Sequence, residues 1–347
     1  MKMKKVLAML LAAVMAASMA ACTGTAPAAT EAPAATAAAT EAVTEAPAAD
    51  TEAAKTYSVG ICQLVQHPAL DAATEGFKAA LTEALGDAVT FNEQNASGES
   101  TNCATIINGF VSSNVDLILA NATSPLQAAV SATSTIPVLG TSITDYASAL
   151  EIDNWTGTVG TNVSGTSDLA PLDQQAAMLQ ELFPDAKTVG LLYCSAESNS
   201  KYQVDVIRGY LEAAGITCTD YAFTDTNDVA SVAQKAADDS DVIYIPTDNT
   251  AASNTEAIAN VVIPAKTPVI AGEEGICKGC GIATLSIDYY SIGYNAGLQA
   301  YDILVNGKNP ADMEIAFADK LTKEYVADRC EKLGITVPDD YVAVAED

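Results

Sequence analysis

The sequence predicts an α/β protein built from two Rossmann-like lobes, each with a parallel sheet. Short apolar runs of strand length alternate with longer amphipathic stretches such as 70–85 and 202–214, a pattern typical of βαβ units. The order of the apolar runs also repeats: 57–62, 116–120 and 136–140 are followed by 188–193, 241–245 and 267–271. Two similar open lobes are therefore expected.

The composition excludes several classes of partner. The 347 residues contain 16 basic and 44 acidic side chains, for a formal net charge of −28. Nucleic acid binding requires clustered Lys and Arg, so we exclude nucleic acid as a partner. The two arginines, Arg208 and Arg329, lie in helical stretches away from the strand ends. Polyanionic ligands are therefore disfavoured, because they usually require bidentate Arg.

Residues 1–21 have the layout of a secretory signal, with a basic start, an apolar run and small residues before Cys22. The segment 19–22, Met-Ala-Ala-Cys, resembles a bacterial lipobox, which implies lipidation of Cys22 and anchoring of the mature chain to a membrane. The alternative is ordinary signal cleavage near Ala21. Either way, we expect the mature chain to lie outside the cytoplasm, in a bacterial cell envelope.

Residues 22–56 consist almost entirely of Ala, Thr, Pro and Glu. The segment offers no large apolar stripe to bury, and its prolines disfavour the alternative of a continuous Ala-rich helix. We therefore expect a tether that holds the folded part away from the membrane.

Polar side chains gather where the expected strands end. In an open parallel sheet these loops form the binding crevice. Any single hydroxyl or amide in such a loop is explained by capping of the following helix. Capping does not explain why acids, amides and hydroxyls accumulate at the strand ends of both halves. The candidate ligand-binding residues are His67, Asn95, Thr123, Ser124, Ser142, Thr144, Ser195, Asn199, Thr247, Asp248, Asn249, Glu273 and Asp288.

This mixture of groups suits a small zwitterion. Backbone N–H groups and the hydroxyl of Thr123 or Ser124 at a helix start can hold one carboxylate. Asp248, Glu273 or Asp288 can receive an ammonium group, and Asp248 is favoured because it follows an apolar strand in the second half. An amino acid is the ligand class that fits both ends.

Enzymatic sites find little support in the sequence. His67 is the only histidine, which excludes multi-histidine metal centres, and it serves equally well as a turn residue or as a ligand contact. Cys277 and Cys280 form one C-x-x-C pair, for which a local disulfide is favoured over a thioredoxin-like redox site or zinc. No nucleophile-elbow, zinc-protease or P-loop spacing occurs. We expect no cofactor, no metal and no catalysis.

Five motifs follow one another along the chain: Gln66–Asp71, Ser164–Leu169, Pro246–Thr250, Ala271–Gly275 and Ser286–Tyr290. Together they resemble a family of substrate-binding lipoproteins of ABC transporters, whose known relatives bind tryptophan, tyrosine or phenylalanine. The resemblance covers about residues 57–335, and the C-x-x-C pair departs from the family pattern.

The resemblance implies a type I periplasmic-binding fold, in which the chain crosses between the lobes three times. The lobe boundaries are then 57–165 with 284–310 for the first lobe, and 166–283 with 311–347 for the second.

The function that follows is capture of a small zwitterion, an aromatic amino acid above others, between two closing lobes. The resemblance also implies ABC permease subunits as partners, and we expect a monomer. The alternatives are a sugar or nucleoside receptor of the same fold, or less favourably a hydrolase or thiol-redox enzyme.

Overall fold

Two sheets form the framework of residues 55–345, which are the residues that this computed structural model describes. The expected signal segment 1–21, the lipidation site Cys22 and nearly all of the tether 22–56 lie outside them. Within residues 55–345, no helix combines the length and the apolar character needed to cross a membrane.

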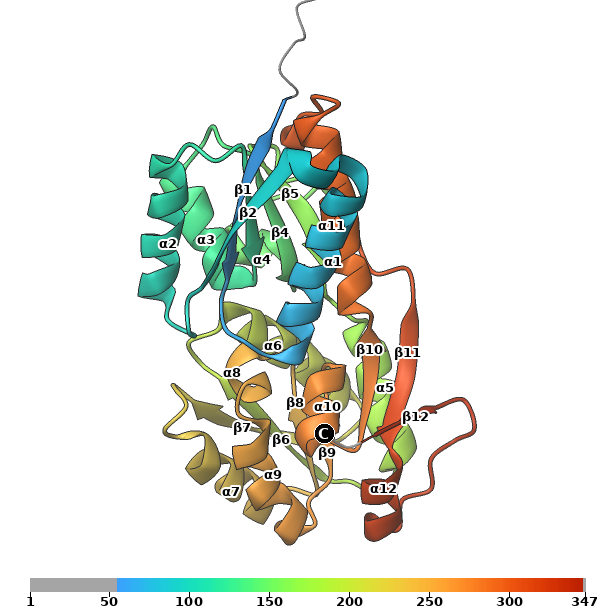
Figure 1. The fold of residues 1–347 in the computed structure, drawn as a ribbon. Helices are drawn as coiled ribbons and strands as arrows, with labels where there is room; N and C mark the ends of the chain where they lie inside the picture. The colour runs from blue at the N-terminus through green and yellow to red at the C-terminus, as the bar shows by residue number, and fades with distance from the viewer. Residues whose placement is uncertain (1–54, 346–347) are drawn as a thin grey trace, which may run out of the picture. The chain divides into compact units, whose positions relative to one another are not determined.

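The first sheet has five parallel strands in the order β2-β1-β3-β4-β5 (Figure 1). Its strands are β1 (Tyr57–Gln63), β2 (Val89–Asn95), β3 (Leu117–Asn121), β4 (Val138–Ile143) and β5 (Val163–Ser167). Its helices are α1 (Pro68–Leu85), α2 (Ser100–Ser112), α3 (Thr123–Ala132), α4 (Tyr146–Ala149) and α11 (Tyr289–Leu304).

The second sheet has seven strands in the order β12-β11-β10-β9-β8-β6-β7. Its strands are β6 (Thr188–Cys194), β7 (Thr217–Phe223), β8 (Val242–Ile245), β9 (Val269–Ala271), β10 (Ala283–Ile287), β11 (Leu321–Val326) and β12 (Val342–Val344). Its helices are α5 (Leu172–Leu182), α6 (Ser198–Ala213), α7 (Val229–Asp239), α8 (Asn249–Ala252), α9 (Thr255–Ala265), α10 (Glu274–Cys280) and α12 (Ala327–Leu333).

Both sheets are covered on both faces, which explains why the central strands consist mostly of apolar residues. All five residues of β3 and all four of β8 are buried. In the first lobe, α1 and α11 pack on one face and α2 with α3 on the other. In the second, α5 and α6 cover one face while α7, α9 and α10 cover the other. The expected class of two α/β lobes is confirmed, although β11 runs antiparallel to β10.

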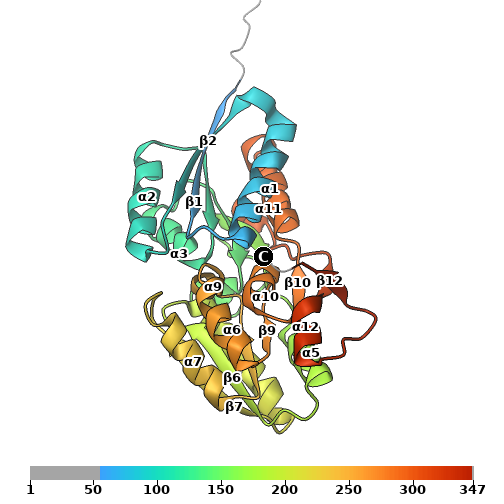
Figure 2. The same cartoon turned by 60° about the horizontal axis from the view of Figure 1, so that its bottom comes forward.

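Helices α1 and α11 lie side by side although they are far apart in the sequence (Figures 1 and 2). Gly293 makes this close approach possible, because a Cβ atom there would collide with the carbonyl oxygen of Ala73. The return of α11 to the first lobe is therefore a packed contact between helices, which secures the second crossing.

The chain crosses between the lobes three times, but not at the boundaries expected from the sequence. Ser167 still belongs to the first sheet, and all of β10 pairs within the second sheet rather than starting the first lobe at residue 284. Met313 and Ile315 pack in the first lobe's cores, so the third crossing follows Ala316 instead of residue 310. Each crossing falls where a strand or bridge ends, because ladder pairing holds the residues before it.

Candidate functional site

The two lobes touch through side chains that follow their strands. The His67 Nε2 atom, in the loop after β1, lies 3.2 Å from the Oδ1 atom of Asn249, the first residue of α8. Gln203 of α6 donates to the Thr144 hydroxyl across the same boundary at 3.4 Å. Both contacts are buried, so the described lobes stand in a closed arrangement.

Most of the sequence-predicted site residues are buried or half-buried. Asn199, Asp248, Asn249 and Glu273 are buried in the second lobe, and the first lobe contributes a matching set. The buried or half-buried candidates are His67, Thr123, Ser124, Ser142, Thr144, Asn199, Thr247, Asp248, Asn249 and Glu273.

Asn95 and Ser195 are exposed and serve local structure instead. The Asn95 Oδ1 atom accepts a hydrogen bond from the backbone N–H of Ser97 at 2.7 Å, which closes a turn after the edge strand β2. The Ser195 hydroxyl donates to the carbonyl of Phe223 at 3.1 Å. Both residues do follow strands, as the sequence predicted, but their side chains form hydrogen bonds with neighbouring backbone groups.

Asp248 is the acid that the sequence favours for an ammonium group, yet its carboxylate is already engaged. Oδ1 accepts from the backbone N–H of Ala251 and Oδ2 from that of Cys194, both at 2.7 Å. Burial, together with the neighbouring Glu197, raises the pKa of Asp248 to about 7. The residue is the N-cap of α8 and a tie between two loops of its own lobe.

The other two predicted acids also cap helices. Glu273 accepts from the backbone N–H groups of Gly275 and Ile276 at the start of α10, and burial raises its pKa to about 7. Asp288 is exposed and accepts from the backbone N–H of Ser291 at 3.1 Å as the N-cap of α11. None of the three favoured acids has an oxygen that is buried and without a partner among the described residues.

Asp168, which the sequence did not single out as a site residue, differs from them. It follows β5 at the first crossing, is 4% exposed, and its Oδ2 atom accepts from the Tyr289 hydroxyl at 3.0 Å. Its Oδ1 atom is buried without a hydrogen-bond partner among residues 55–345. Burial raises the pKa of Asp168 to about 6, although the hydroxyls of Tyr289 and Thr144 oppose the shift. A buried carboxylate oxygen without a donor is costly, so this atom indicates where a donor belongs.

The available signal for Asp168 was its place in the Ser164–Leu169 motif, directly before the first crossing. Glu197 and Gln203 were also missed, because a loop acid and a helical glutamine carry no distinctive pattern. Their contacts depend on the packing of α6 against the loop after β8: Gln203 accepts from the Thr247 N–H at 3.0 Å, and Glu197 accepts from the Asn249 N–H at 3.0 Å.

The first lobe offers groups suited to a carboxylate. Helix α3 begins at Thr123 after Ala122, and no described side chain caps its first N–H groups. Ser142, at the end of β4, adopts a φ of 56° and is 6% exposed. Its hydroxyl has no hydrogen-bond partner in the part of the chain that the structure describes. Such amides and hydroxyls bind an anion without requiring a cationic side chain.

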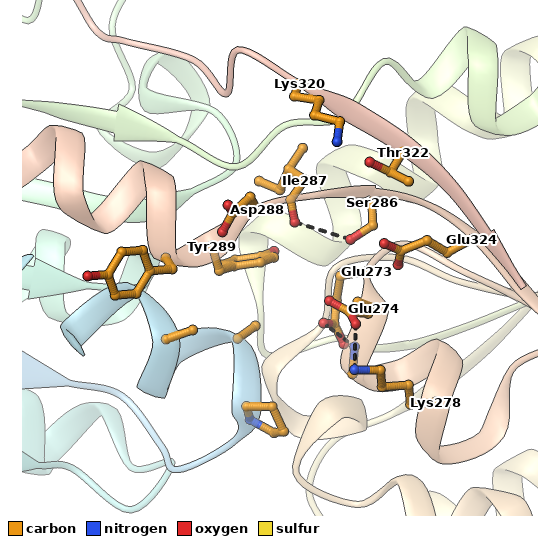
Figure 3. Close-up of a pocket in the computed structure, with 15 residues that line it drawn as sticks. Glu273, Glu274, Lys278, Ser286, Ile287, Asp288, Tyr289, Lys320, Thr322 and Glu324 are labelled. Atoms are coloured by element: carbon orange, nitrogen blue, oxygen red, sulfur yellow. Dashed lines mark hydrogen bonds and ion pairs between the residues drawn. The ribbon is translucent and has the colours of Figure 1, made fainter. Parts of the chain in front are cut away.

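A cavity of about 460 Å³ opens between the start of α1, the start of α10 and strands β10 and β11 (Figure 3). Glu273 and Tyr289 line it, and Tyr289 joins it to Asp168. Glu274 and Lys278 form an ion pair on its α10 side. The volume lies within the range typical of small-molecule sites.

A metal site and a reactive thiol each require a particular arrangement of side chains. Among the described residues, no group of three or more His, Cys, Asp or Glu side chains is placed to hold a metal ion. Cys277 and Cys280 are free and buried, not joined in the expected local disulfide. Burial raises the pKa of Cys280 to about 12, which disfavours a reactive thiolate.

Two solved relatives differ in whether a ligand is bound. The chain is 31% identical to an ABC domain from Streptococcus pneumonia in complex with L-Trp, covering 84% of this chain and 100% of that one, with a TM-score of 0.80. It is 35% identical to a substrate binding protein with adhesive properties from Clostridium difficile, solved in a ligand-free, open form, with coverages of 84% and 100% and a TM-score of 0.65. The described lobes therefore match the ligand-bound relative better in shape, despite the lower identity.

More distant structures share only the fold. A leucine binding protein from Thermotoga maritima is 15% identical over 72% of this chain and 83% of its own, with a TM-score of 0.55.

A curated relative and a family model agree on the classification. The chain is 35% identical over 273 residues to a tyrosine-binding protein of Clostridioides difficile, which covers 78% of this chain and 79% of the relative. The model of the ABC transporter substrate binding protein family matches residues 58–347. This protein belongs to the substrate-binding proteins of ABC transporters, a family that acts outside the cytoplasm.

Proposed function

We propose that this protein captures an aromatic amino acid between its lobes and delivers it to an ABC permease. The observation that carries the proposal is the buried Oδ1 atom of Asp168: no described residue makes a hydrogen bond to it, although the Thr144 hydroxyl acts on the same carboxylate. An ammonium group supplies a donor and a compensating charge at the same time. The L-Trp and tyrosine named for two relatives support the aromatic class.

The opposite end of the zwitterion fits the first lobe. We assign the carboxylate to the uncapped N–H groups at the start of α3 and to the Ser142 hydroxyl. Both arginines are engaged elsewhere: Arg208 pairs with Asp220, and Arg329 donates to backbone carbonyls such as that of Gly281. A single carboxylate therefore suits this site better than a phosphate or a dicarboxylate.

The site binds and does not react, in our proposal. The carboxylate oxygens of the buried acids Asp248 and Glu273 accept hydrogen bonds from backbone N–H groups. These acids are therefore poorly placed for proton transfer to a substrate. Closure of two lobes around one small molecule is sufficient for a receptor that presents its closed form to a permease.

The ligand class is tested by calorimetric titration and melting curves of the full-length protein. We expect L-tryptophan, L-tyrosine or L-phenylalanine to raise the melting temperature, with glucose, adenosine and L-leucine as comparisons. At about 100-fold over the dissociation constant the gain is roughly 2.7 kcal/mol. Stabilisation by glucose or adenosine, with no aromatic amino acid active, would show that the receptor belongs to another ligand class.

We also propose that Cys22 carries a lipid and that residues 22–56 act as the tether. Metabolic labelling with a fatty acid should mark the wild-type chain but not Cys22→Ser, which should leave the membrane fraction or stay unprocessed. Equal labelling of both chains would contradict the anchor.

A further inference from the structure

His67 is the only histidine in the sequence, and it stands at the boundary of the lobes. It precedes α1 as the N-cap residue but makes no side-chain cap. The residue is 7% exposed. Nε2 faces Asn249 of the other lobe, while Nδ1 is buried without a hydrogen-bond partner among the described residues. The protonation of each ring nitrogen can be worked out from the groups around it.

Glu197 determines which way the Asn249 amide points. Its Oε2 atom accepts from the Asn249 Nδ2 atom at 2.7 Å and from the Asn249 backbone N–H at 3.0 Å. Its Oε1 atom accepts from the backbone N–H and the hydroxyl of Thr250 at 2.8 and 2.7 Å. A carboxylate can only accept these hydrogen bonds. The NH₂ group of Asn249 therefore points toward Glu197, and its amide oxygen faces His67.

The imidazole must then place its hydrogen on Nε2, since an amide oxygen can only accept. Burial lowers the pKa of His67, against the opposing effects of Asn249, Glu197 and Asp71, and this favours the neutral ring. A neutral ring with its hydrogen on Nε2 presents only a lone pair at Nδ1. The buried Nδ1 atom therefore calls for a donor from outside the described side chains.

We propose that His67 Nδ1 accepts a hydrogen bond from a ring-borne N–H or O–H of the ligand, and that the chain Glu197–Asn249–His67 fixes this acceptor when the lobes close. The proposal rests on the proposed function, because it assumes an aromatic amino acid in the site. Glu197 and Asn249 are positioning residues, and both lie in the lobe opposite His67. The Nδ1 atom of His67 is therefore held as an acceptor only when the lobes are closed.

The ammonium group is a poorer candidate for this donor than the ring. We assign the ammonium to Asp168, which follows β5, whereas His67 follows β1, and β3 and β4 lie between these strands. The sheet order does not fix the distance between His67 and Asp168, since Ala69 at the start of α1 belongs to the same apolar cluster as Ala170. With the ammonium group held by Asp168, the donor left for His67 is on the side chain, where tyrosine or tryptophan carries a phenol O–H or an indole N–H. Phenylalanine carries neither.

A single histidine makes the first test direct. In nitrogen NMR of the full-length protein labelled at histidine, we expect a neutral ring with Nε2 protonated when the ligand is bound. L-Tyrosine or L-tryptophan should shift the Nδ1 resonance in the direction of an accepted hydrogen bond, and L-phenylalanine should not. A ring protonated at Nδ1, or the same Nδ1 resonance with all three ligands, would overturn the proposal.

The second test compares affinities in pairs that differ in the ring donor. The pairs are L-tyrosine with L-phenylalanine, and L-tryptophan with L-3-benzothienylalanine, in which sulfur replaces the indole N–H. A ligand without the donor leaves a buried acceptor unsatisfied, so wild type should prefer the donor-bearing member by about tenfold. Whichever pair shows the preference identifies the ring.

Two variants serve as matched controls. His67→Asn keeps an acceptor near the position of Nδ1, whereas His67→Gln keeps a polar group near Nε2 and removes the acceptor. We expect the preference to fall close to one in His67→Gln and to persist in part in His67→Asn. Asn249→Ala should convert the ring in the labelled protein from one tautomer to a mixture.

The outcomes separate the two claims. If wild type binds no aromatic amino acid, the proposed function fails. If wild type binds one but shows no preference for a ring donor, or His67→Gln retains the full preference, only the role of His67 fails. The NMR test on wild type decides the matter if a variant does not fold.

Discussion

The two lobes use the same residue types after their strands for different purposes. In the second lobe, the carboxylates of Asp248 and Glu273 are not available to a ligand, because each accepts hydrogen bonds from two backbone N–H groups. In the first lobe and its crossing, Ser142 and Asp168 each have a buried oxygen without a partner among residues 55–345. The difference teaches that Asp248 and Glu273 stabilise loops of their own lobe, whereas Ser142 and Asp168 each have an oxygen that can accept or share a hydrogen bond with a ligand.

The largest expected effect is on ligand affinity, in Asp168→Asn. The substitution keeps the shape and removes the charge that would meet the ammonium group. Truncating one member of a desolvated charge pair costs about 2 to 5 kcal/mol, which is roughly a thirtyfold loss of affinity or more. Titration with the ligand identified for wild type measures it. Affinity within threefold of wild type would mean that the ammonium group lies elsewhere.

The matched substitution in the second lobe, Asp248→Asn, should act on stability. An Asn amide cannot accept from both Ala251 and Cys194, so one buried N–H loses its partner at a cost of about 1 to 3 kcal/mol. Denaturant unfolding without ligand should record that loss, while the affinity of the folded protein stays close to wild type. A large loss of affinity at unchanged stability would reverse the contrast between the lobes.

The dependence on pH should have opposite signs for stability and for binding. The pKa of Asp168 in the folded protein is raised from 3.8 to about 6, so the folded state holds its proton more tightly than the unfolded chain does. Its contribution to stability is therefore fully present below pH 4 and is lost as the pH rises through 6. Asp248 and Glu273, with folded pKa values raised to about 7, act in the same direction.

Ligand affinity should instead rise over the same interval, because an ammonium group needs the ionised form of Asp168. Below the pKa, each pH unit should weaken binding by up to about tenfold. Titrations between pH 5 and 7.5 measure the slope, and Asp168→Asn should flatten it. A slope that survives this substitution would assign the titration to another group.

The smallest effect is expected for Ser142→Ala. Loss of one hydroxyl to a bound carboxylate costs about 1 kcal/mol, a several-fold loss of affinity, and the stability of the free protein should not fall because the hydroxyl has no partner there. Ser195→Ala is the control, because that exposed hydroxyl bonds to backbone and should leave affinity unchanged. Equal effects of the two substitutions would argue against a carboxylate at Ser142.

The sequence by itself determined the framework of this protein. The apolar runs at 57–62, 116–120, 188–193 and 241–245 became β1, β3, β6 and β8, because strands buried on both faces must consist mostly of apolar residues. Topology then placed the polar loops at one end of each sheet, so that the positions of His67, Ser142 and Asn249 near the ends of β1, β4 and β8 could be predicted from order alone.

Only the tertiary structure decided which of those polar atoms remained available. Asp248 and Asp168 both follow strands, and no local pattern tells them apart; the difference is that the Cys194 N–H reaches Asp248, while no described donor reaches Oδ1 of Asp168. The orientation of the Asn249 amide depends on Glu197, which is 52 residues away in the chain. Hydrogen bonds between distant segments form only when helices and loops pack, so their partners cannot be read from local sequence.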